Sequence, residues 1–374
     1  MIPVSAPVIG PEERAYVLQA LERGEISSSG RFVAEFEERW AAYCGRRFGV
    51  AVVNGTAALQ LAVALLELNR GDEVILPTFT IISCALAIIN AGAVPRLVDS
   101  DPRTWCMSVD DVHRAIGRRT RAIMPVHIYG HPVDMDAILD LADRHDLTVI
   151  EDAAEAHGAE YRSSTDGRWR RCGSFGAISC FSFYANKLVT TGEGGMLVTD
   201  DPQLAERARL LRNLAFEGVR RFRHERAGFN FRMTNLQAAL GIPQIARMNE
   251  IVAKKRWIAA EYTRRLTGIQ GIELQAEEHW ARSVHWMYGL VLRADTGCDA
   301  ETFSRRLTEL GVETRPFFLG MHEQPVFRRS GLFAGESYPI AERLARQGLY
   351  LPSGLGITAE QIDRVTASVQ QALV

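Results

Sequence analysis

The apolar residues between Asn54 and Ala154 alternate between two spacings, and this alternation constrains the fold more than any other feature of the chain. Segments with a helical period of about 3.6 residues are separated by short, β-branched runs such as EVILP (73–77) and LTVIEDAA (147–154). Strands that alternate with helices in this way pair as a parallel sheet, because each helix returns the chain to the edge where the next strand begins. The pattern therefore predicts an α/β fold with a large, mostly parallel sheet.

The expected elements in this first part of the chain are short and closely spaced. The periodicity predicts helices over residues 54–68, 80–92, 110–117 and 134–146. It predicts strands over residues 73–77, 94–99, 121–128, 147–154, 177–183 and 195–200. Sheets of this kind bind their ligands at the carboxyl ends of the strands, so we expect functional residues in the segments that follow the strands.

The pattern changes at about Asn235, where a long amphipathic helix extends to Leu266. Pro243 interrupts it and is expected to kink the helix or to end a first segment. We therefore expect a large α/β domain over residues 1–240, which carries the site, and a small C-terminal α/β domain over residues 241–374 that includes the long connecting helix. The elements expected after this helix are strands over 285–293 and 312–318 and helices over 300–311 and 358–373.

Composition excludes several classes of function. The chain has 374 residues, of which 47% are hydrophobic and 24% charged, and these values are typical of a globular protein. A formal net charge of −2 gives no electrostatic basis for binding nucleic acid or an anionic membrane, although basic residues cluster in EGVRRFRHERAGFNFR (217–232). The apolar run 80–94 is too short to span a bilayer, and residues 1–16 lack the pattern of a signal peptide. We expect a cytoplasmic protein with no nucleic-acid or membrane partner.

The six cysteines are scattered and show no C-x-x-C spacing. This distribution argues against a zinc site and against a disulfide framework, and it is compatible with a reducing compartment. We expect no metal site.

A single lysine, Lys187, stands between an aromatic, strand-like segment and the glycine-rich stretch GEGG (192–195). Most lysines lie on the surface, but the small and aromatic neighbours of Lys187 predict a desolvated amine close to a ligand. An amine that loses its proton easily is suited to form a Schiff base, and this chemistry points to pyridoxal phosphate.

The other requirements of pyridoxal phosphate have candidates in the chain. Asp152, at the end of an expected strand, is placed to pair with the pyridine nitrogen, and Glu155 follows three residues later. Gly55 and Thr56 open an expected helix, whose free N–H groups favour a phosphate, and Ser182 offers a hydroxyl. Each motif alone favours an ordinary cap, strand end or exposed residue, but their combination in this order favours the cofactor site.

The same segments resemble the DegT/DnrJ/EryC1/StrS family of sugar aminotransferases. The resemblance extends from MIPVSAPVIGPEE almost to the C-terminus, and it is carried by the motifs NGTAAL, GDEVILPTFT, HIYGHPVDMD, VIEDAAEAHGA, FSFYANKLVTTGEGGMLVTDD and GFNFRMTNLQAA. It implies a fold-type I, pyridoxal phosphate-dependent aminotransferase that is active as a homodimer, with its sites at the subunit interface.

The resemblance also implies a role for each matching residue. Lys187 would be the Schiff-base lysine, and Asp152 would contact the pyridine nitrogen. Glu155 would contact the ring hydroxyl, a position that is often Gln in the wider family. The phosphate would be held by Gly55, Thr56 and Ser182, and by Asn230 of the neighbouring subunit.

The implied reaction has two halves. Glutamate would convert the cofactor to pyridoxamine phosphate, and the amine would pass to a keto group of a nucleotide-linked sugar, with Lys187 as general base and acid. The implied substrate is GDP-4-keto-6-deoxymannose and the product GDP-perosamine. A dTDP- or UDP-linked keto sugar, a 3-keto-6-deoxy sugar or a keto-cyclitol would use the same residues and stays open. A catalytically inactive, pyridoxal phosphate-binding regulator is the non-enzyme alternative, against which the intact Lys187 and Asp152 argue.

Two residues depart from the family pattern, and several others are weaker candidates. Pro243 interrupts a segment that is usually a continuous helix in the family. Ile81 stands where the family usually has an aromatic residue that stacks on the cofactor ring. Five further residues lie near expected strand ends or in the C-terminal part, where substrate contact and a purely structural role are both compatible with the sequence: His127, Tyr129, His157, His285 and Arg315.

Overall fold

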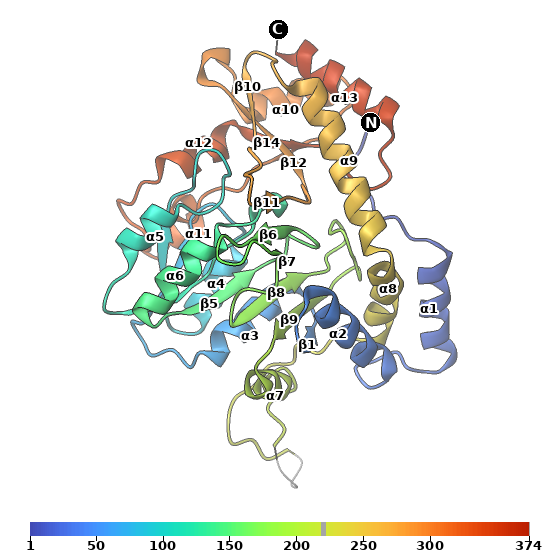
Figure 1. The fold of residues 1–374 in the computed structure, drawn as a ribbon, viewed down its shortest axis with the longest axis vertical. Helices are drawn as coiled ribbons and strands as arrows, with labels where there is room; N and C mark the ends of the chain where they lie inside the picture. The colour runs from blue at the N-terminus through green and yellow to red at the C-terminus, as the bar shows by residue number, and fades with distance from the viewer. Residues whose placement is uncertain (218–221, 374) are drawn as a thin grey trace.

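The computed structural model describes residues 1–217 and 222–373, and a seven-stranded sheet lies at its centre (Figure 1). The strands follow one another across the sheet in the order β1 (Phe48–Val52), β9 (Gly195–Thr199), β8 (Ile178–Ser182), β5 (Thr148–Asp152), β4 (Thr120–Ile123), β2 (Glu73–Pro77) and β3 (Val94–Val98). Every neighbouring pair is parallel except the two that involve β9, which runs antiparallel to β1 and to β8. The large, mostly parallel sheet is therefore confirmed, and the six remaining strands end at one edge.

Helices surround this sheet, and many of them begin at a side-chain cap. Asn54, Ser108, Asp134, Asp201 and Thr234 each accept a hydrogen bond from a backbone N–H in the first turn. The helices before residue 267 are α1 (Pro11–Glu22), α2 (Arg31–Cys44), α3 (Gly55–Leu65), α4 (Ser83–Asn90), α5 (Val109–Ala115), the 3₁₀ turn η1 (Ile128–Gly130), α6 (Met135–His145), α7 (Pro202–Leu211), α8 (Asn235–Ala246) and α9 (Met248–Leu266).

A second, antiparallel sheet lies beyond α9, which extends along one side of the molecule toward it (Figure 1). Its strands are β10 (Ile272–Leu274), β12 (Tyr288–Leu292), β14 (Gly348–Leu351) and β13 (Arg315–Pro316). The helices of this part are η2 (Ala294–Thr296), α10 (Ala300–Glu309), η3 (Met321–Glu323), α11 (Pro325–Arg329), α12 (Pro339–Gln347) and α13 (Ala359–Ala372). A small third sheet joins β11 (Ala281–Arg282), β6 (Glu160–Arg162) and β7 (Trp169–Arg171).

The described residues contain two buried apolar clusters. The larger surrounds the central sheet, and the smaller lies between the second sheet and helices α9, α10 and α13, with Tyr262 and Phe303 fully buried. Some C-terminal residues cross between the two parts, because Phe317 packs in the larger cluster and β11 pairs with β6. The division at residue 240 stays a prediction.

Several observed elements are shorter than the expected ones, and two of them are interrupted near a proline. The strand expected over 121–128 ends at Ile123, because Pro125 has no N–H to continue the ladder. The strand expected over 312–318 is observed only at Arg315–Pro316. Pro243 lies inside α8, and the long helix is divided four residues later at Arg247. None of the described helices is long and apolar enough to cross a membrane.

The contact between β9 and the start of α3 leaves no room for a side chain at Gly195. A Cβ at this position would lie 2.2 Å from the carbonyl oxygen of Asn54. We expect Gly195→Ala to lower the free energy of unfolding by about 1–3 kcal/mol, because the backbone at the helix start has to move. Denaturant unfolding measures the change. Gly117→Ala is the control, since a Cβ there meets no described atom within 4 Å, and an equal loss in both variants would contradict the prediction.

Candidate active site

A cavity of ≈ 440 Å³ lies at the edge of the central sheet where the parallel strands end. Its walls come from the segments that follow β1, β2, β5 and β8, and from Trp286, Phe318 and Tyr350 of the C-terminal part. The cavity thus lies at the edge where the βα pattern predicts ligands. The residues proposed from the sequence that line it are Gly55, Thr56, Asp152, Glu155, Ser182 and Lys187.

The amino end of α3 closes one side of this cavity. Asn54 caps the helix by accepting a hydrogen bond from the N–H of Ala57 at 2.8 Å. The amides of Gly55 and Thr56 carry no hydrogen bond within the part of the chain that the structure describes. A Cβ on Gly55 would lie 2.7 Å from the Cβ of Ser182, so glycine lets the helix start approach β8 closely. Two free amides and a neighbouring hydroxyl form a site suited to a phosphate group.

Asp152 is the last residue of β5 and is only 2% exposed. Its carboxylate accepts hydrogen bonds from the thiol of Cys84 at 3.2 Å and from the N–H of Ala154 at 3.1 Å. Burial raises the pKa of Asp152, and it outweighs the lowering effect of these hydrogen bonds and of the Lys187 charge. A buried carboxylate on one wall is therefore ready to pair with a cationic ring nitrogen.

Lys187 projects into the same cavity from the turn after β8. Its Nζ lies 3.9 Å from Oε1 of Glu155 and 3.4 Å from the centre of the Trp286 ring. Burial lowers the pKa of Lys187, although the charges of Glu155 and Asp152 oppose this effect. The amine thus gives up its proton more easily than a surface lysine, as its sequence setting predicts.

Glu155 is held between the amine and the backbone. One carboxylate oxygen accepts the N–H of Tyr129 at 2.7 Å, and the other faces Lys187. Burial raises the pKa of Glu155 to about 7, against the lowering effect of Lys187. A carboxyl group that titrates near neutral pH can donate or accept a proton at the cavity wall.

Asn230 does not line the cavity. It is exposed, and its side-chain oxygen accepts a hydrogen bond from Arg232 at 3.1 Å. Of the basic segment around it, Arg220 and Arg221 lie outside the described residues, whereas Arg223 and Arg226 are exposed and form ion pairs with nearby glutamates. The segment that leads to Asn230 extends from the body of the molecule beyond α7 (Figure 1).

Three of the weaker candidates have structural contacts. His127 is fully buried and hydrogen-bonded on both ring nitrogens, to Glu151 and to the N–H of Val133. Tyr129 is fully buried among aromatic rings, including Phe317 and Phe318. His157 packs against Trp40, Phe181 and Phe183, and burial lowers its pKa to about 3.

His285 and Arg315 lie outside the cavity lining. His285 faces Glu277 at 3.8 Å. Arg315 is exposed and pairs with Glu313 at 3.1 Å, although it is the strand neighbour of Tyr350, which does line the cavity. Their contact with a substrate stays a prediction.

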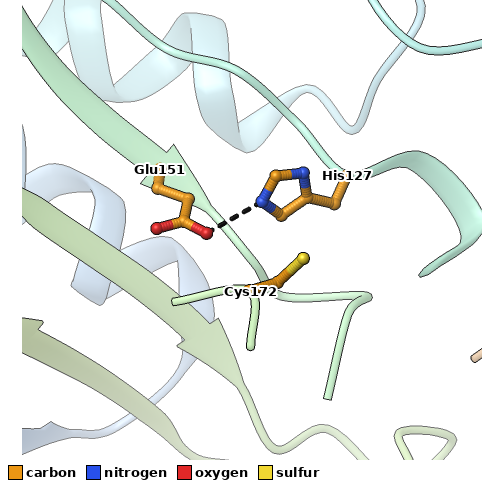
Figure 2. A group of neighbouring side chains, drawn as sticks. All are labelled: His127, Glu151 and Cys172. Atoms are coloured by element: carbon orange, nitrogen blue, oxygen red, sulfur yellow. Dashed lines mark hydrogen bonds and ion pairs between the residues drawn. The ribbon is translucent and has the colours of Figure 1, made fainter. Parts of the chain in front are cut away.

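His127, Glu151 and Cys172 form a buried group whose potential ligand atoms lie within 4.8 Å of one another (Figure 2). The N–H of Val133 donates to Nδ1 of His127, so the ring proton lies on Nε2 and points to Glu151 at 2.9 Å. Both ring nitrogens are therefore occupied by hydrogen bonds. Glu151 also accepts hydrogen bonds from Phe175, Gly176 and Ser179. We interpret the group as a hydrogen-bonded core element and assign no metal to it.

Trp286 and Cys84 belong to the site and are absent from the sequence-based set of candidates. Trp286 stands in a segment expected as a strand, and its contact with Lys187 joins residues 99 positions apart. Cys84 lies in an expected helix and contacts Asp152 across 68 positions. The local pattern around each residue is that of an ordinary core residue, so only the tertiary structure reveals these contacts.

The hydrogen bonds of Glu151 predict an acid-dependent stability. Burial raises its pKa, but the hydrogen bonds from His127, Gly173 and Phe175 outweigh this effect and lower the pKa to about 2. Because the folded-state pKa is depressed, the stabilisation is complete above the unfolded-state pKa and is lost as pH falls toward 2. We expect Glu151→Gln to lower the free energy of unfolding at pH 7 by about 3 kcal/mol.

The difference in the free energy of unfolding between Glu151→Gln and the wild-type chain is expected to become smaller as the pH falls from 5 to 2. Denaturant unfolding across this range measures it. Glu22→Gln, at an exposed position, is the control and is expected to change stability by less than about 0.5 kcal/mol at every pH. A difference that does not depend on pH would contradict the proposed role of the carboxylate charge.

Comparison with known proteins places this chain in one family. A model of the DegT/DnrJ/EryC1/StrS aminotransferase family matches residues 7–370. GDP-perosamine synthase of Caulobacter vibrioides is 42% identical over 376 residues, which cover 100% of this chain and 98% of the relative. The putative pyridoxal phosphate-dependent aminotransferase EpsN of Bacillus subtilis is 35% identical and covers 97% of this chain and 93% of its own.

A solved structure agrees with these relatives. DesV of S. venezuelae, in complex with a ketimine intermediate, has a TM-score of 0.89 at 36% identity, covering 97% of this chain and 94% of that chain. The resemblance seen in the sequence motifs and the expected α/β fold are thereby confirmed. The chain belongs to the DegT/DnrJ/EryC1/StrS aminotransferase family and is a sugar aminotransferase.

Proposed function

We propose that this protein transfers an amino group from glutamate to the keto group of a nucleotide-linked sugar, with pyridoxal phosphate as cofactor. The observation that carries this proposal is the cavity itself, which is lined by a desolvated lysine, an anion site and a buried carboxylate. These three features match the aldehyde, the phosphate and the pyridine nitrogen of one molecule. The homodimer and the glutamate donor are part of the proposal.

The residues present fit the cofactor. The free amides of Gly55 and Thr56 and the hydroxyl of Ser182 would hold the phosphate. Asp152 would face the pyridine nitrogen, and Glu155 would face the ring hydroxyl. When bound, pyridoxal phosphate supplies a carbonyl carbon for an amine and an electron sink for the adjacent carbon.

Lys187 would carry the protons of the reaction. Because its pKa is lowered by burial, a larger fraction of the amine is neutral and able to take a proton from a carbon atom. The same Nζ would then donate this proton to a second carbon, so that the proton moves between the substrate carbon and the cofactor carbon. Glu155, whose pKa is raised by burial, lies 3.9 Å from this amine and would stabilise its ammonium form between these steps.

The aromatic walls exclude water from this exchange. Trp286 is 6% exposed and covers the Lys187 amine, and Phe318 and Tyr350 line the cavity beside it. Ile81 is 41% exposed and borders the same space, so an aliphatic side chain would contact the ring where the family usually has an aromatic one. Dispersion contacts would replace part of the stacking.

We propose GDP-4-keto-6-deoxymannose as the sugar substrate and GDP-perosamine as the product. This choice is supported by the 42% identity to GDP-perosamine synthase, which extends over the whole chain. Asn230 is exposed in the single chain, which supports its proposed role at the phosphate of the neighbouring subunit.

The cofactor proposal predicts the behaviour of Lys187→Ala. Protein incubated with pyridoxal phosphate is expected to become yellow, and borohydride is expected to fix the cofactor to the peptide that contains Lys187. The alanine variant would bind the cofactor without a covalent bond, and its turnover would fall by roughly 10³-fold or more. Absorbance, peptide mass and an amino-transfer assay measure these effects. Lys254→Arg is the control, and a colourless wild-type protein would refute the proposal.

The substrate proposal predicts a preference for the GDP-linked sugar. With glutamate as donor, kcat/KM for GDP-4-keto-6-deoxymannose is expected to exceed that for a dTDP-linked 4-keto-6-deoxy sugar by at least about tenfold, because contacts to the wrong base leave polar groups unpaired. Product analysis by mass spectrometry and NMR identifies the amino sugar and the position of its amine. A preference for dTDP would overturn the substrate and leave amino transfer intact.

A further inference from the structure

The chain contains 43 basic residues, of which 40 are arginines and only three are lysines: Lys187, Lys254 and Lys255. All three line a second cavity, of ≈ 230 Å³, which adjoins the first at Asn186, Lys187 and Trp286. A chain that uses arginine nearly everywhere retains lysine at one place. The amines at this cavity differ from a guanidinium because they are compact and can lose a proton, and their contacts indicate why lysine is used there.

Lys255 is buried in α9 and reaches the backbone of two distant segments. Its Nζ donates to the carbonyl of Trp286 at 2.9 Å and to the carbonyl of Ser353 at 2.6 Å. Only 3% of the residue is exposed, and burial lowers its pKa to about 7. A compact amine fits between these two carbonyls, whereas a planar guanidinium is larger. Lys255 thus ties the start of β12 to the long helix.

Trp286 is fixed at a second point, next to the lysine of the first cavity. Its indole Nε1–H donates to the carbonyl of Asn186 at 2.9 Å, and Asn186 immediately precedes Lys187. The ring face is thereby turned to the amine, whose Nζ lies 3.4 Å from the ring centre. A cation this close to a desolvated indole face is attracted by the negative face of the ring.

We propose that Trp286 is a positioning residue that binds the ammonium of Lys187 whenever this amine is free, and that Lys255 holds Trp286 in place from behind. The indole contact needs no hydrogen bond, so the amine leaves it without breaking one. The charged groups that face Lys187 are Glu155 and Asp152, and the nearby His157 is neutral. Burial opposes the ammonium form, and the ring adds to the two carboxylates in favouring it.

The timing of this contact rests on the proposed function, in which Lys187 is released from the cofactor during each half of the reaction. The contact itself does not depend on that function. It is therefore tested in the full chain without bound cofactor, so that its failure and the failure of amino transfer are distinguishable.

Lysine labelling gives a direct test, because a chain with three lysines gives three side-chain signals. The protein is labelled with ¹³Cε-lysine, treated with hydroxylamine and dialysed, so that any bound aldehyde leaves as its oxime and Lys187 is free without amino transfer. The signals are then followed by NMR as a function of pH. The Lys187 signal is assigned by its loss in Lys187→Ala. In the wild type this signal is expected to be displaced upfield by the indole ring. In Trp286→Leu the displacement is expected to disappear and the pKa of Lys187 to fall by about one pH unit.

Two further variants separate a positioning role from a general structural one. Trp286→Phe retains an aromatic face and is expected to retain part of the displacement and of the pKa. Lys255→Met removes the hydrogen bond to the Trp286 carbonyl and is expected to reduce the upfield displacement of Lys187 while the indole is present. If Trp286→Leu fails to fold, these two variants decide the test.

The chain also provides a matched control, since Lys254 lies 3.7 Å from the ring centre of Trp257 on the same helix. Trp257→Leu is expected to move the Lys254 signal and to leave Lys187 unchanged. A Lys187 signal and pKa that are the same in Trp286→Leu as in the wild type would overturn the proposal. An unchanged displacement in Lys255→Met would overturn the role of Lys255.

Discussion

The burial of Asp152, Glu155 and Lys187 in one small space is the constraint on which the rest of the site depends. Each charged group loses hydration, and any one of them alone would carry a large desolvation cost. Together they compensate one another, because the amine lies 3.9 Å from Glu155 and its charge lowers the pKa of both carboxyls. The backbone completes this compensation through the N–H groups of Tyr129 and Ala154. The energetic balance makes the protonation of these groups sensitive to any ligand that enters.

The central sheet makes this arrangement possible. Six strands end at the same edge, and the chain leaves β5 and β8 with Asp152 and Ser182 as the last residues. The reversed strand β9 begins at this edge with Gly195, close against Asn54. The start of α3 is thus held between β8 and β9, so the pairing of these two strands also positions the anion site. Stability and ligand binding share the same backbone contacts here.

The sequence predicts the residues that the βα pattern brings to one edge, and it fails where contacts come from elsewhere. Lys187, Asp152 and Gly55 follow strands, so topology alone places them together. Trp286 lies two residues before β12 of the second sheet, and its position depends on how that sheet packs against the first. His127 follows a strand as well, yet its ring turns into the core toward Glu151, and strand-end position does not report the direction of a side chain. Pro125 shortens a strand whose apolar pattern alone gives no end.

The rarity of lysine has a chemical consequence beyond the local contacts. Guanidinium groups stay protonated near neutral pH and do not condense with aldehydes there, whereas neutral amines do. With its positive surface charge carried by arginine, this chain offers an incoming aldehyde few nucleophiles outside the cavity. Selective attachment of an aldehyde to Lys187 then depends partly on the whole surface, because the scarcity of other lysines leaves few competing amines.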